Sequence, residues 1–364
     1  MALDNFTFKN RIEKLQRKMN EASIDAFLIP PGANFTYLTG MDVESMERLT
    51  LLVVDSDNFT VVCPSLMKEQ VIEESPIKNI VSWNDDENPY NKTSELISRC
   101  KGIAVEGKLQ FLHLYELNKI LGKDLLYRDD ILTELRIMKE EKELAAIGEA
   151  VKRSEKSLEV SLEKLVPGIT ELQFSRILEN EYFNQGMPGV AFSTIVSFGK
   201  NAAMPHHSPD NTKARKGDSV VIDYGGRFDS YASDSTRTFF LGNPGEKMLD
   251  VYETVKQANE DTRNMISENT TYAAMDRNAR NIIESRGYGK YFIHRLGHGL
   301  GLEVHEEPYL IPKNNYRVLK NSVFTIEPGV YIENLGGVRI EDTNYFNGNK
   351  CVAFNSMSRE CIIL

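Results

Sequence analysis

Four carboxylates and one imidazole in the C-terminal half of the chain have the types and local surroundings of metal ligands. Each lies close to glycine, proline or β-branched residues. The carboxylates together carry a formal charge of about −4, which two divalent cations would neutralise, and the imidazole makes the two metal positions unequal. Such a set indicates a two-metal hydrolytic centre. The five residues are Asp223, Asp234, His298, Glu327 and Glu341.

Two of these carboxylates follow one another on consecutive β runs. Asp223 ends the run SVVID, and an aspartate before Tyr-Gly-Gly is by itself an ordinary turn former. Asp234 comes eleven residues later, in the segment SDSTRT. Two antiparallel strands joined by a loop of that length would place both carboxylates side by side, where their repulsion is costly without cations.

Three of the six histidines, His294, His298 and His305, lie in the glycine-rich segment HRLGHGLGLEVHEEP. A glycine-rich turn with polar surface histidines is the alternative interpretation. Glycines let the backbone approach a ligand closely, which favours a site. His206 and His207 lie in the loop NAAMPHHSPDN. Loops of this composition often carry histidines without a function, so this motif is weak alone.

The remaining two carboxylates also lie at β runs. Glu327 in TIEPG ends a run, and the following proline and glycine would turn the chain. Glu341 in GGVRIED shares a strand face with Arg339, because strand side chains repeat every two residues. An ordinary surface pair of arginine and glutamate is the alternative.

The composition is typical of a soluble protein and argues against several classes of function. The chain has 364 residues, of which 41% are hydrophobic and 26% charged, so two domains are expected. The net charge of −10 argues against a nucleic-acid partner, which requires a basic face. No apolar run predicts a membrane span, and the N-terminus lacks a signal-peptide core. The four scattered cysteines are expected to be free thiols in a cytoplasmic protein.

Hydrophobic periodicity divides the chain near residues 124–132. Before this boundary, helical and strand-like segments alternate, which predicts an α/β layer domain over residues 1–128. After it, one long helical stretch is expected from residue 133 to the Val-Pro-Gly at 166–168. Further helices are expected at about 171–186, 246–268 and 272–286, interleaved with the β runs that carry the candidate ligands.

Together these segments resemble the pita-bread metallopeptidase family, which contains Xaa-Pro dipeptidase (prolidase), aminopeptidase P, methionine aminopeptidase and the metal-free creatinase. The match runs from about residue 135 to the C-terminus, with the motifs in the family's order and spacing. The resemblance implies an α+β pita-bread catalytic domain over residues 129–364 and a creatinase-like α/β domain before it. It also implies that the five candidate ligands hold two metals, with Asp234 and Glu341 bridging them.

The resemblance also implies roles for residues around the metals. His206, rather than His207, matches the family's catalytic-loop histidine, because it lies seventeen residues before Asp223. His206 and His305 would stabilise the oxyanion, and Glu327 would act as general base. The residues implied to contact substrate or to orient the ligands are His294, His305, Tyr309, Tyr331 and Arg339.

The function implied is hydrolysis of the peptide bond between an N-terminal residue and proline, by a hydroxide that bridges the two metals. Xaa-Pro dipeptidase is the first hypothesis, and aminopeptidase P acting on longer peptides is the alternative. An inactive pita-bread binding module is a remote alternative, because such proteins usually lack ligands that are intact here. Oxygen-rich ligands without thiolate favour Mn²⁺ or Co²⁺, ahead of Zn²⁺ or Fe²⁺. A proline-containing peptide is the expected partner, and the family is expected to form homodimers.

One position departs from the pattern of several prolidases. These have an arginine directly after Glu-x-Pro, where it pairs with the carboxylate of a dipeptide, whereas here Tyr309 follows Glu306-Glu307-Pro308. A tyrosine donates one hydrogen bond but makes no bidentate ionic contact. The departure favours acceptance of longer Xaa-Pro peptides, unless another cation supplies the charge.

Overall fold

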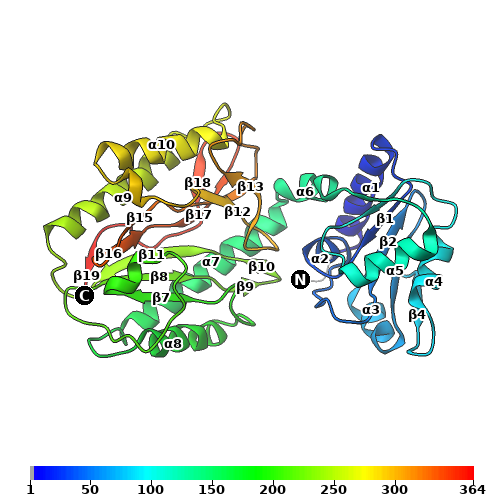
Figure 1. The fold of residues 1–364 in the computed structure, drawn as a ribbon, viewed down its shortest axis with the longest axis horizontal. Coiled ribbons are helices and arrows are strands. Elements are labelled where there is room, and N and C mark those ends of the chain that lie inside the picture. Colours follow the sequence, from blue (N-terminus) through cyan, green and yellow to red (C-terminus); the bar gives the residue numbers. More distant parts are fainter. Residues whose placement is uncertain (1–3) are drawn as a thin grey trace. The chain divides into compact units, whose positions relative to one another are not determined.

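The computed structural model describes residues 4–364, which divide into two compact units between Arg136 and Ile137. Figure 1 shows the strands and helices of both units. The sequence-based domain limit at residue 128 lies at the start of helix α6 (Asp129–Ile137) and stays a prediction. Among the described residues, no helix is both long enough and apolar enough to cross a membrane.

The first unit is built on one mixed sheet of six strands in the order β4-β3-β2-β1-β5-β6. β1 pairs antiparallel with β2 and parallel with β5, and Leu28, Val53 and Val105 lie in the core of this unit. The predicted α/β architecture is confirmed. The strands are β1 (Ala26–Ile29), β2 (Leu51–Asp55), β3 (Phe59–Pro64), β4 (Ile80–Trp83), β5 (Ile103–Val105) and β6 (Leu125–Tyr127). The helices before α6 are α1 (Asn5–Glu21), α2 (Ala33–Thr39), the 3₁₀ turn η1 (Ser65–Met67), α3 (Lys68–Glu74), α4 (Pro89–Leu96) and α5 (Phe111–Leu121).

The helical stretch expected from residue 133 onward is interrupted, so the prediction of one continuous helix is wrong. α6 ends at Ile137, and α7 (Glu141–Leu162) begins four residues later. Between them, Lys139 is buried and its ammonium lies 2.6 Å from Glu306 Oε1. Glu140 then begins α7 with a capping box. Tertiary contacts therefore fix a non-helical segment where periodicity alone predicts helix.

The second unit contains two larger sheets, and each candidate metal ligand lies on or beside one of their strands. One sheet has the order β19-β11-β8-β7 and the other β13-β12-β14-β17-β18. β9 pairs with β10, and β15 with β16, as two separate hairpins. The strands are β7 (Ile195–Phe198), β8 (Ser219–Tyr224), β9 (Arg227–Phe228), β10 (Tyr231–Ala232), β11 (Ser235–Phe240), β12 (Gly297–Gly299), β13 (Glu306–Leu310), β14 (Val323–Ile326), β15 (Gly329–Ile332), β16 (Gly336–Arg339), β17 (Asp342–Phe346), β18 (Cys351–Ala353) and β19 (Ile362–Ile363).

Helices cover the two sides of these strands, with α7 and α8 on one side and α9 and α10 on the other (Figure 1). α8 packs on the first sheet through Phe174 and Ile222, and α10 shares a core with the second sheet through Met275 and Ile326. This layered α+β unit confirms the fold that the family resemblance implies. The remaining elements are α8 (Glu171–Asn184), η2 (Gly199–Ala203), α9 (Glu246–Asn264), α10 (Tyr272–Ser285) and η3 (Gly289–Tyr291).

Candidate metal centre

Strand register brings the first two carboxylates together. Asp223 of β8 pairs with Thr236 of β11, and Asp234 lies two residues before Thr236, directly ahead of the strand. Side chains two residues apart, and side chains directly opposite in a pair, share one face of a sheet. Asp223 and Asp234 therefore point to the same side, and their carboxylates form a group with Glu341 whose oxygens lie within 4.8 Å of one another.

The second sheet supplies the other two carboxylates. Ile326 of β14 pairs with Asp342 of β17. Glu327 follows the first of these residues and Glu341 precedes the second, so the antiparallel pairing places the two glutamates at the same end of the sheet. An isolated bridge between Glu341 and Thr236 of β11 joins this end to the first sheet. The two sheets thus meet where the four carboxylates lie.

The candidate histidine ligand lies on a strand that approaches its neighbour very closely. His298 is the central residue of β12, between Gly297 and Gly299. A Cβ atom at Gly297 would lie 2.1 Å from the backbone oxygen of Thr325. Only glycine fits at this distance, which gives a physical reason for one glycine of the motif.

The hydrogen bonds of His298 fix its tautomer. Nδ1 lies 3.0 Å from the carbonyl oxygen of Gly299, which accepts only, so Nδ1 carries the proton. Nε2 keeps its lone pair and lies 3.3 Å from Glu327 Oε1 and 3.5 Å from Asp234 Oδ2. A histidine that donates one ring N–H to a carbonyl and turns the other nitrogen to carboxylates has the arrangement of a metal ligand.

Two buried oxygens of the cluster have no hydrogen-bond partner among the described residues, Asp223 Oδ1 and Glu341 Oε1. Burying a carboxylate oxygen without a donor is costly, and a bound cation would remove that cost. His298, Glu327 and Glu341 also form a group whose ligand atoms lie within 4.8 Å of one another. The residues present therefore fit divalent metal ions.

Without cations, burial favours the protonated form of three carboxyl groups of the cluster. Burial, reinforced by the neighbouring carboxylates, raises the pKa of Asp234 and Glu341 well above the ordinary values. Burial also raises the pKa of Glu327 to about 8, although Arg339 opposes the shift. Burial lowers the pKa of His298 to about 3, so its imidazole is neutral and able to bind a metal.

Arg339 orients two of the carboxylates. Its Nη2 donates to Asp223 Oδ2 at 2.7 Å, and its Nε donates to Thr236 Oγ1 at 2.9 Å. Thr236 in turn donates to Glu341 Oε2 at 2.7 Å. These bonds hold Asp223 Oδ2 and Glu341 Oε2, and the other oxygen of each carboxylate is the one without a partner. The arginine and the threonine thus fix the carboxylates and leave one oxygen of each for a metal.

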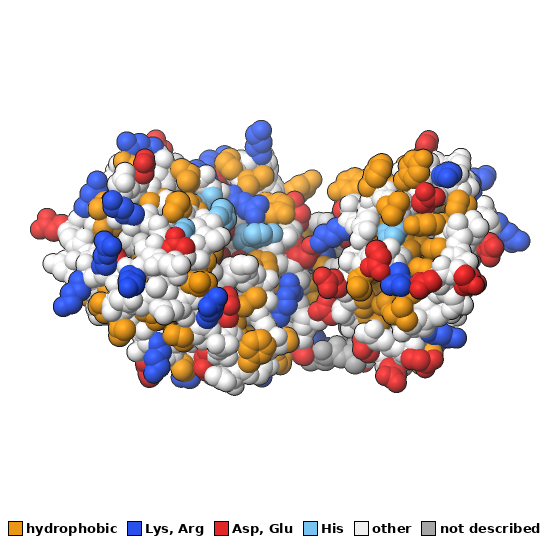
Figure 2. Space-filling model, turned by 60° about the horizontal axis from the view of Figure 1, so that its bottom comes forward, with side chains coloured by type: hydrophobic (Ala, Val, Ile, Leu, Met, Phe, Trp, Pro, Cys, Tyr) orange, Lys and Arg blue, Asp and Glu red, His pale blue; other side chains and the backbone are white. Residues whose placement is uncertain are grey.

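A cavity of about 410 Å³ adjoins the cluster, and its lining includes all five candidate ligands. His206, His305 and Arg339 also line it, beside apolar side chains that include Phe192 and Val304. Figure 2 shows histidine side chains gathered at one place on the surface of this unit. The structure therefore brings the metal cluster and the three expected polar side chains to a single cavity.

His294 also lines this cavity, but both of its ring nitrogens are already engaged. Nδ1 donates to Arg295 O at 2.7 Å, so Nε2 accepts from the Tyr331 hydroxyl at 3.0 Å. That hydroxyl accepts from Arg339 Nη1 at 2.9 Å. Burial, together with Arg339, lowers the pKa of His294 to about 3. The ring is thus neutral and has no ring nitrogen free to bind a ligand, while Tyr331 supports it and is not itself a lining residue.

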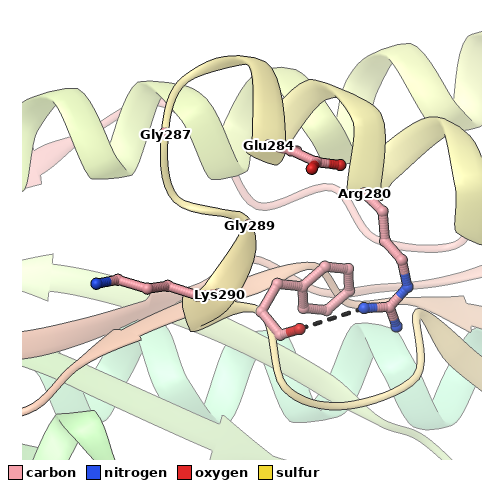
Figure 3. A pocket seen from close by; sticks show the side chains of 6 residues that line it. Arg280, Glu284, Gly287, Gly289 and Lys290 are labelled. Carbon is pink, nitrogen blue, oxygen red and sulfur yellow. Dashed lines mark hydrogen bonds between the residues drawn. The ribbon is translucent and has the colours of Figure 1, made fainter.

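A second pocket, of about 400 Å³, lies beside α10 and η3 and is lined in part by Arg280 and Phe292 (Figure 3). Arg280 donates to Phe292 O at 3.2 Å and to His294 O at 2.6 Å. Its guanidinium also pairs with Asp276 of the same helix. The arginine therefore ties α10 to the segment that carries His294.

Arg295 is a residue that the sequence analysis missed. It lines the cavity, and its guanidinium carbon lies 4.4 Å from the centre of the Tyr309 ring. Within residues 4–364 this guanidinium forms no ion pair. Tyr309 supports the arginine and does not line the cavity itself. Two features of the sequence could have indicated this role. Arg295 lies between His294 and His298, and Tyr309 stands where several prolidases have an arginine.

Both parts of the chain match known families. Residues 145–346 match Metallopeptidase family M24, and residues 11–138 match the Creatinase/Prolidase N-terminal domain. A protein named Xaa-Pro dipeptidase from Pyrococcus furiosus is 34% identical over 355 residues, which cover 97% of this chain and 100% of that protein.

Solved structures agree over the full length. A recombinant prolidase from Thermococcus sibiricus has a TM-score of 0.94 and 36% sequence identity, covering 100% of both chains. An X-Pro aminopeptidase from Thermotoga maritima has a TM-score of 0.88 and 28% identity, covering 97% of this chain and 99% of that chain. Because a prolidase and an aminopeptidase both align end to end, the fold alone does not distinguish peptide length.

The metal-free protein is expected to lose stability as the pH rises from 7 to 8. The folded chain keeps a proton on Glu327, whose pKa is raised to about 8, whereas the unfolded chain has already ionised this group. The raised pKa values of Asp234 and Glu341 act in the same direction. Each retained proton then lowers the free energy of unfolding by at most about 1.4 kcal/mol per pH unit. Urea denaturation after treatment with EDTA measures this slope, and added Mn²⁺ should abolish it.

Histidines do not produce the same slope. His294 and His298 are neutral in the folded chain, and above pH 7 they are mostly neutral in the unfolded chain as well. The variant Glu341→Gln removes one titrating carboxyl and should have a shallower slope. A metal-free protein whose stability rises between pH 7 and pH 8 would contradict the account.

Proposed function

The chain belongs to metallopeptidase family M24, and from this membership we propose that it is an Xaa-Pro dipeptidase, which hydrolyses the bond between an N-terminal residue and proline. The observation that carries the proposal is the buried cluster of four carboxylates and one imidazole beside a cavity of about 410 Å³. Full-length relatives named Xaa-Pro dipeptidase and prolidase support the substrate class. Hydrolysis of Ala-Pro by the metal-loaded protein, and its loss on chelation, is the direct test.

We propose that Asp223, Asp234, His298, Glu327 and Glu341 hold two divalent metal ions, with Asp234 and Glu341 shared between them. When bound, two such cations polarise the scissile carbonyl and acidify the attacking water. The ligands are oxygens and one nitrogen, with no thiolate, which favours Mn²⁺ or Co²⁺ over Zn²⁺ or Fe²⁺.

In this proposal, Glu327 acts as the general base and then as the general acid of the reaction. Its carboxylate lines the cavity, and its Oε1 accepts a hydrogen bond from Thr325 Oγ1 at 3.3 Å, which holds the side chain in place. It takes a proton from water as the water attacks the carbonyl carbon. It then delivers that proton to the proline nitrogen as the C–N bond breaks.

His206 and His305 donate N–H groups to the oxygen that gains charge in the transition state. Both line the cavity next to the cluster. Burial, together with Arg295, lowers the pKa of His305, so the neutral imidazole is its stable form near pH 7. A neutral imidazole carries one N–H, and a donor of this kind contributes on the order of 3 kcal/mol to transition-state stabilisation.

The apolar part of the cavity suits a proline ring. Phe192, Ile195 and Val304 line it, and His294 beside them has both ring nitrogens engaged in hydrogen bonds, so it offers no polar nitrogen to the substrate. Proline has no backbone N–H, so an enzyme cannot recognise it through that donor. The cavity must therefore recognise the proline ring by its shape and by apolar contact.

Arg295 is the cation that we assign to the carboxylate of a dipeptide. Its guanidinium lines the cavity, lies over the Tyr309 ring and forms no ion pair with residues 4–364. A guanidinium binds a carboxylate through two parallel hydrogen bonds. Arg295 therefore supplies the charge that the sequence analysis did not find at Tyr309, and this supports dipeptides as the preferred substrates.

Aminopeptidase P is the second candidate function. It is favoured by Tyr309 in place of an arginine and by the similarity to an X-Pro aminopeptidase. Homodimer formation is a further proposal from the family resemblance, and a cytoplasmic location is a further proposal from the composition and the cysteine usage. The four cysteines, which are all unpaired, are compatible with a reducing compartment.

The metal-loaded protein should contain two metal ions per chain, and Asp234→Asn or Glu341→Gln should remove at least one. A shared carboxylate neutralises part of the repulsion between two cations, so loss of its charge destabilises the pair. Inductively coupled plasma mass spectrometry after gel filtration measures the content. Two ions and full activity in both variants would exclude these residues as bridging ligands.

His206→Ala should lower kcat by roughly 10²- to 10³-fold while leaving the metal content unchanged, because it removes a donor to the transition state and no ligand. Steady-state hydrolysis of Ala-Pro measures kcat. Retention of the wild-type kcat would exclude His206 from the oxyanion site.

Arg295→Gln should lower kcat/KM for Ala-Pro by one to two decades, as expected for loss of a charged hydrogen bond of about 1.5–3 kcal/mol. The same variant should change kcat/KM for Ala-Pro amide, which has no carboxylate, by much less. Tyr309→Phe keeps an aromatic ring beneath the arginine and is the matched control. Equal losses on the acid and the amide, or equal wild-type rates on Ala-Pro and Ala-Pro-Ala, would favour the aminopeptidase.

A further inference from the structure

A buried pair outside the metal cluster fastens the loop that carries His206. Glu171, the first residue of α8, is fully buried, and its Oε2 lies 2.7 Å from His207 Nε2. His207 itself is mostly buried, with 10% of its side chain exposed. A carboxylate cannot donate, so Nε2 carries the proton and donates to Glu171. His207, which follows the proposed catalytic His206, is thus hydrogen-bonded to the first residue of α8.

Both carboxylate oxygens of Glu171 accept two hydrogen bonds each. Oε1 accepts from Phe198 N at 2.7 Å and from Asn201 Nδ2 at 3.0 Å. Oε2 accepts from His207 and also from Asp210 N at 3.1 Å. A carboxylate offers about four lone-pair sites, and four donors occupy them. Glu171, His207 and Asp210 lie close enough to bind a cation, but the glutamate has no oxygen lone pair left for one.

His206 lies between two points at which the loop is fixed. On one side, Arg339 Nη1 donates to Pro205 O at 3.4 Å. On the other side, His207 donates to Glu171. His206 is itself exposed to the cavity, so its position depends on these flanking residues.

We propose that His207 is a positioning residue, which holds the His206 imidazole at the metal cluster through its hydrogen bond to Glu171. The consequence for catalysis rests on the proposed function, whereas the anchoring of the loop does not. A displacement of about 1 Å in a catalytic group can cost on the order of 10²-fold in rate. The pair therefore contributes to kcat without contacting substrate or metal.

Hydrogen–deuterium exchange of residues 200–212 tests the anchor independently of activity. His207→Leu should speed exchange of this segment on the order of tenfold or more, because the charged hydrogen bond is lost. His207→Gln keeps an N–H donor and should restore part of the protection. Ser208→Ala, at the next and exposed position, is the control and should not change exchange. Unchanged exchange in His207→Leu would overturn the proposal.

A double-mutant cycle on Ala-Pro hydrolysis tests the catalytic consequence. His207→Leu should lower kcat on the order of tenfold to a hundredfold, with KM and a content of two metals unchanged, and His207→Gln should recover part of the rate. In a His206→Ala background, His207→Leu should lower kcat by no more than about threefold, because the imidazole that His207 positions is absent. Multiplicative losses, or loss of a metal ion with His207, would overturn positioning through His206. A wild-type protein inactive on every Xaa-Pro peptide would refute the proposed function instead, and the exchange result would still decide the anchor.

Discussion

The mutual repulsion of four carboxylates in a buried place is the constraint on which the second unit depends. Asp223 Oδ1 and Glu341 Oε1 have no hydrogen-bond partner among the described residues, and burial, reinforced by neighbouring carboxylates, raises the pKa values of Asp234 and Glu341. Without cations, burying these carboxylates close together destabilises the folded state. Divalent metals bound at the cluster would offset this repulsion, so the proposed metal site and the stability of the unit would be linked.

The arrangement of strands follows from this constraint. Two sheets meet at the bridge between Thr236 and Glu341, and each contributes two of the four carboxylates. Arg339 and Thr236 hold one oxygen of Asp223 and of Glu341 and leave the other without a donor. Around this centre, the histidines take different tasks because of their hydrogen bonds. His298 has a free Nε2 facing the carboxylates, His294 has both ring nitrogens engaged, and His207 is hydrogen-bonded to the buried Glu171 at a helix terminus.

The grouping of the candidate ligands around one cavity was predictable because each stands in a local motif with a backbone reason for its place. The close approach of β12 at Gly297 and the cross-strand register of Asp223 are local properties of this kind. The break between α6 and α7 was not predictable from periodicity, since the segment between them is held by contacts such as that of Lys139 with Glu306, far along the chain. Arg295 and Glu171 were missed for a similar reason. Arginine and glutamate are common on helices and loops, and only tertiary structure reveals that one faces the cavity and the other accepts four hydrogen bonds.

The most direct test of the central claim is a crystal structure of the manganese-loaded protein measured at the Mn absorption edge. The account predicts two anomalous peaks per chain, roughly 3.5–4 Å apart as in other two-metal sites, both among the five residues of the cluster. One of them should contact the free Nε2 of His298. No peak in the cluster, or a peak between Glu171 and His207 in its place, would contradict the account.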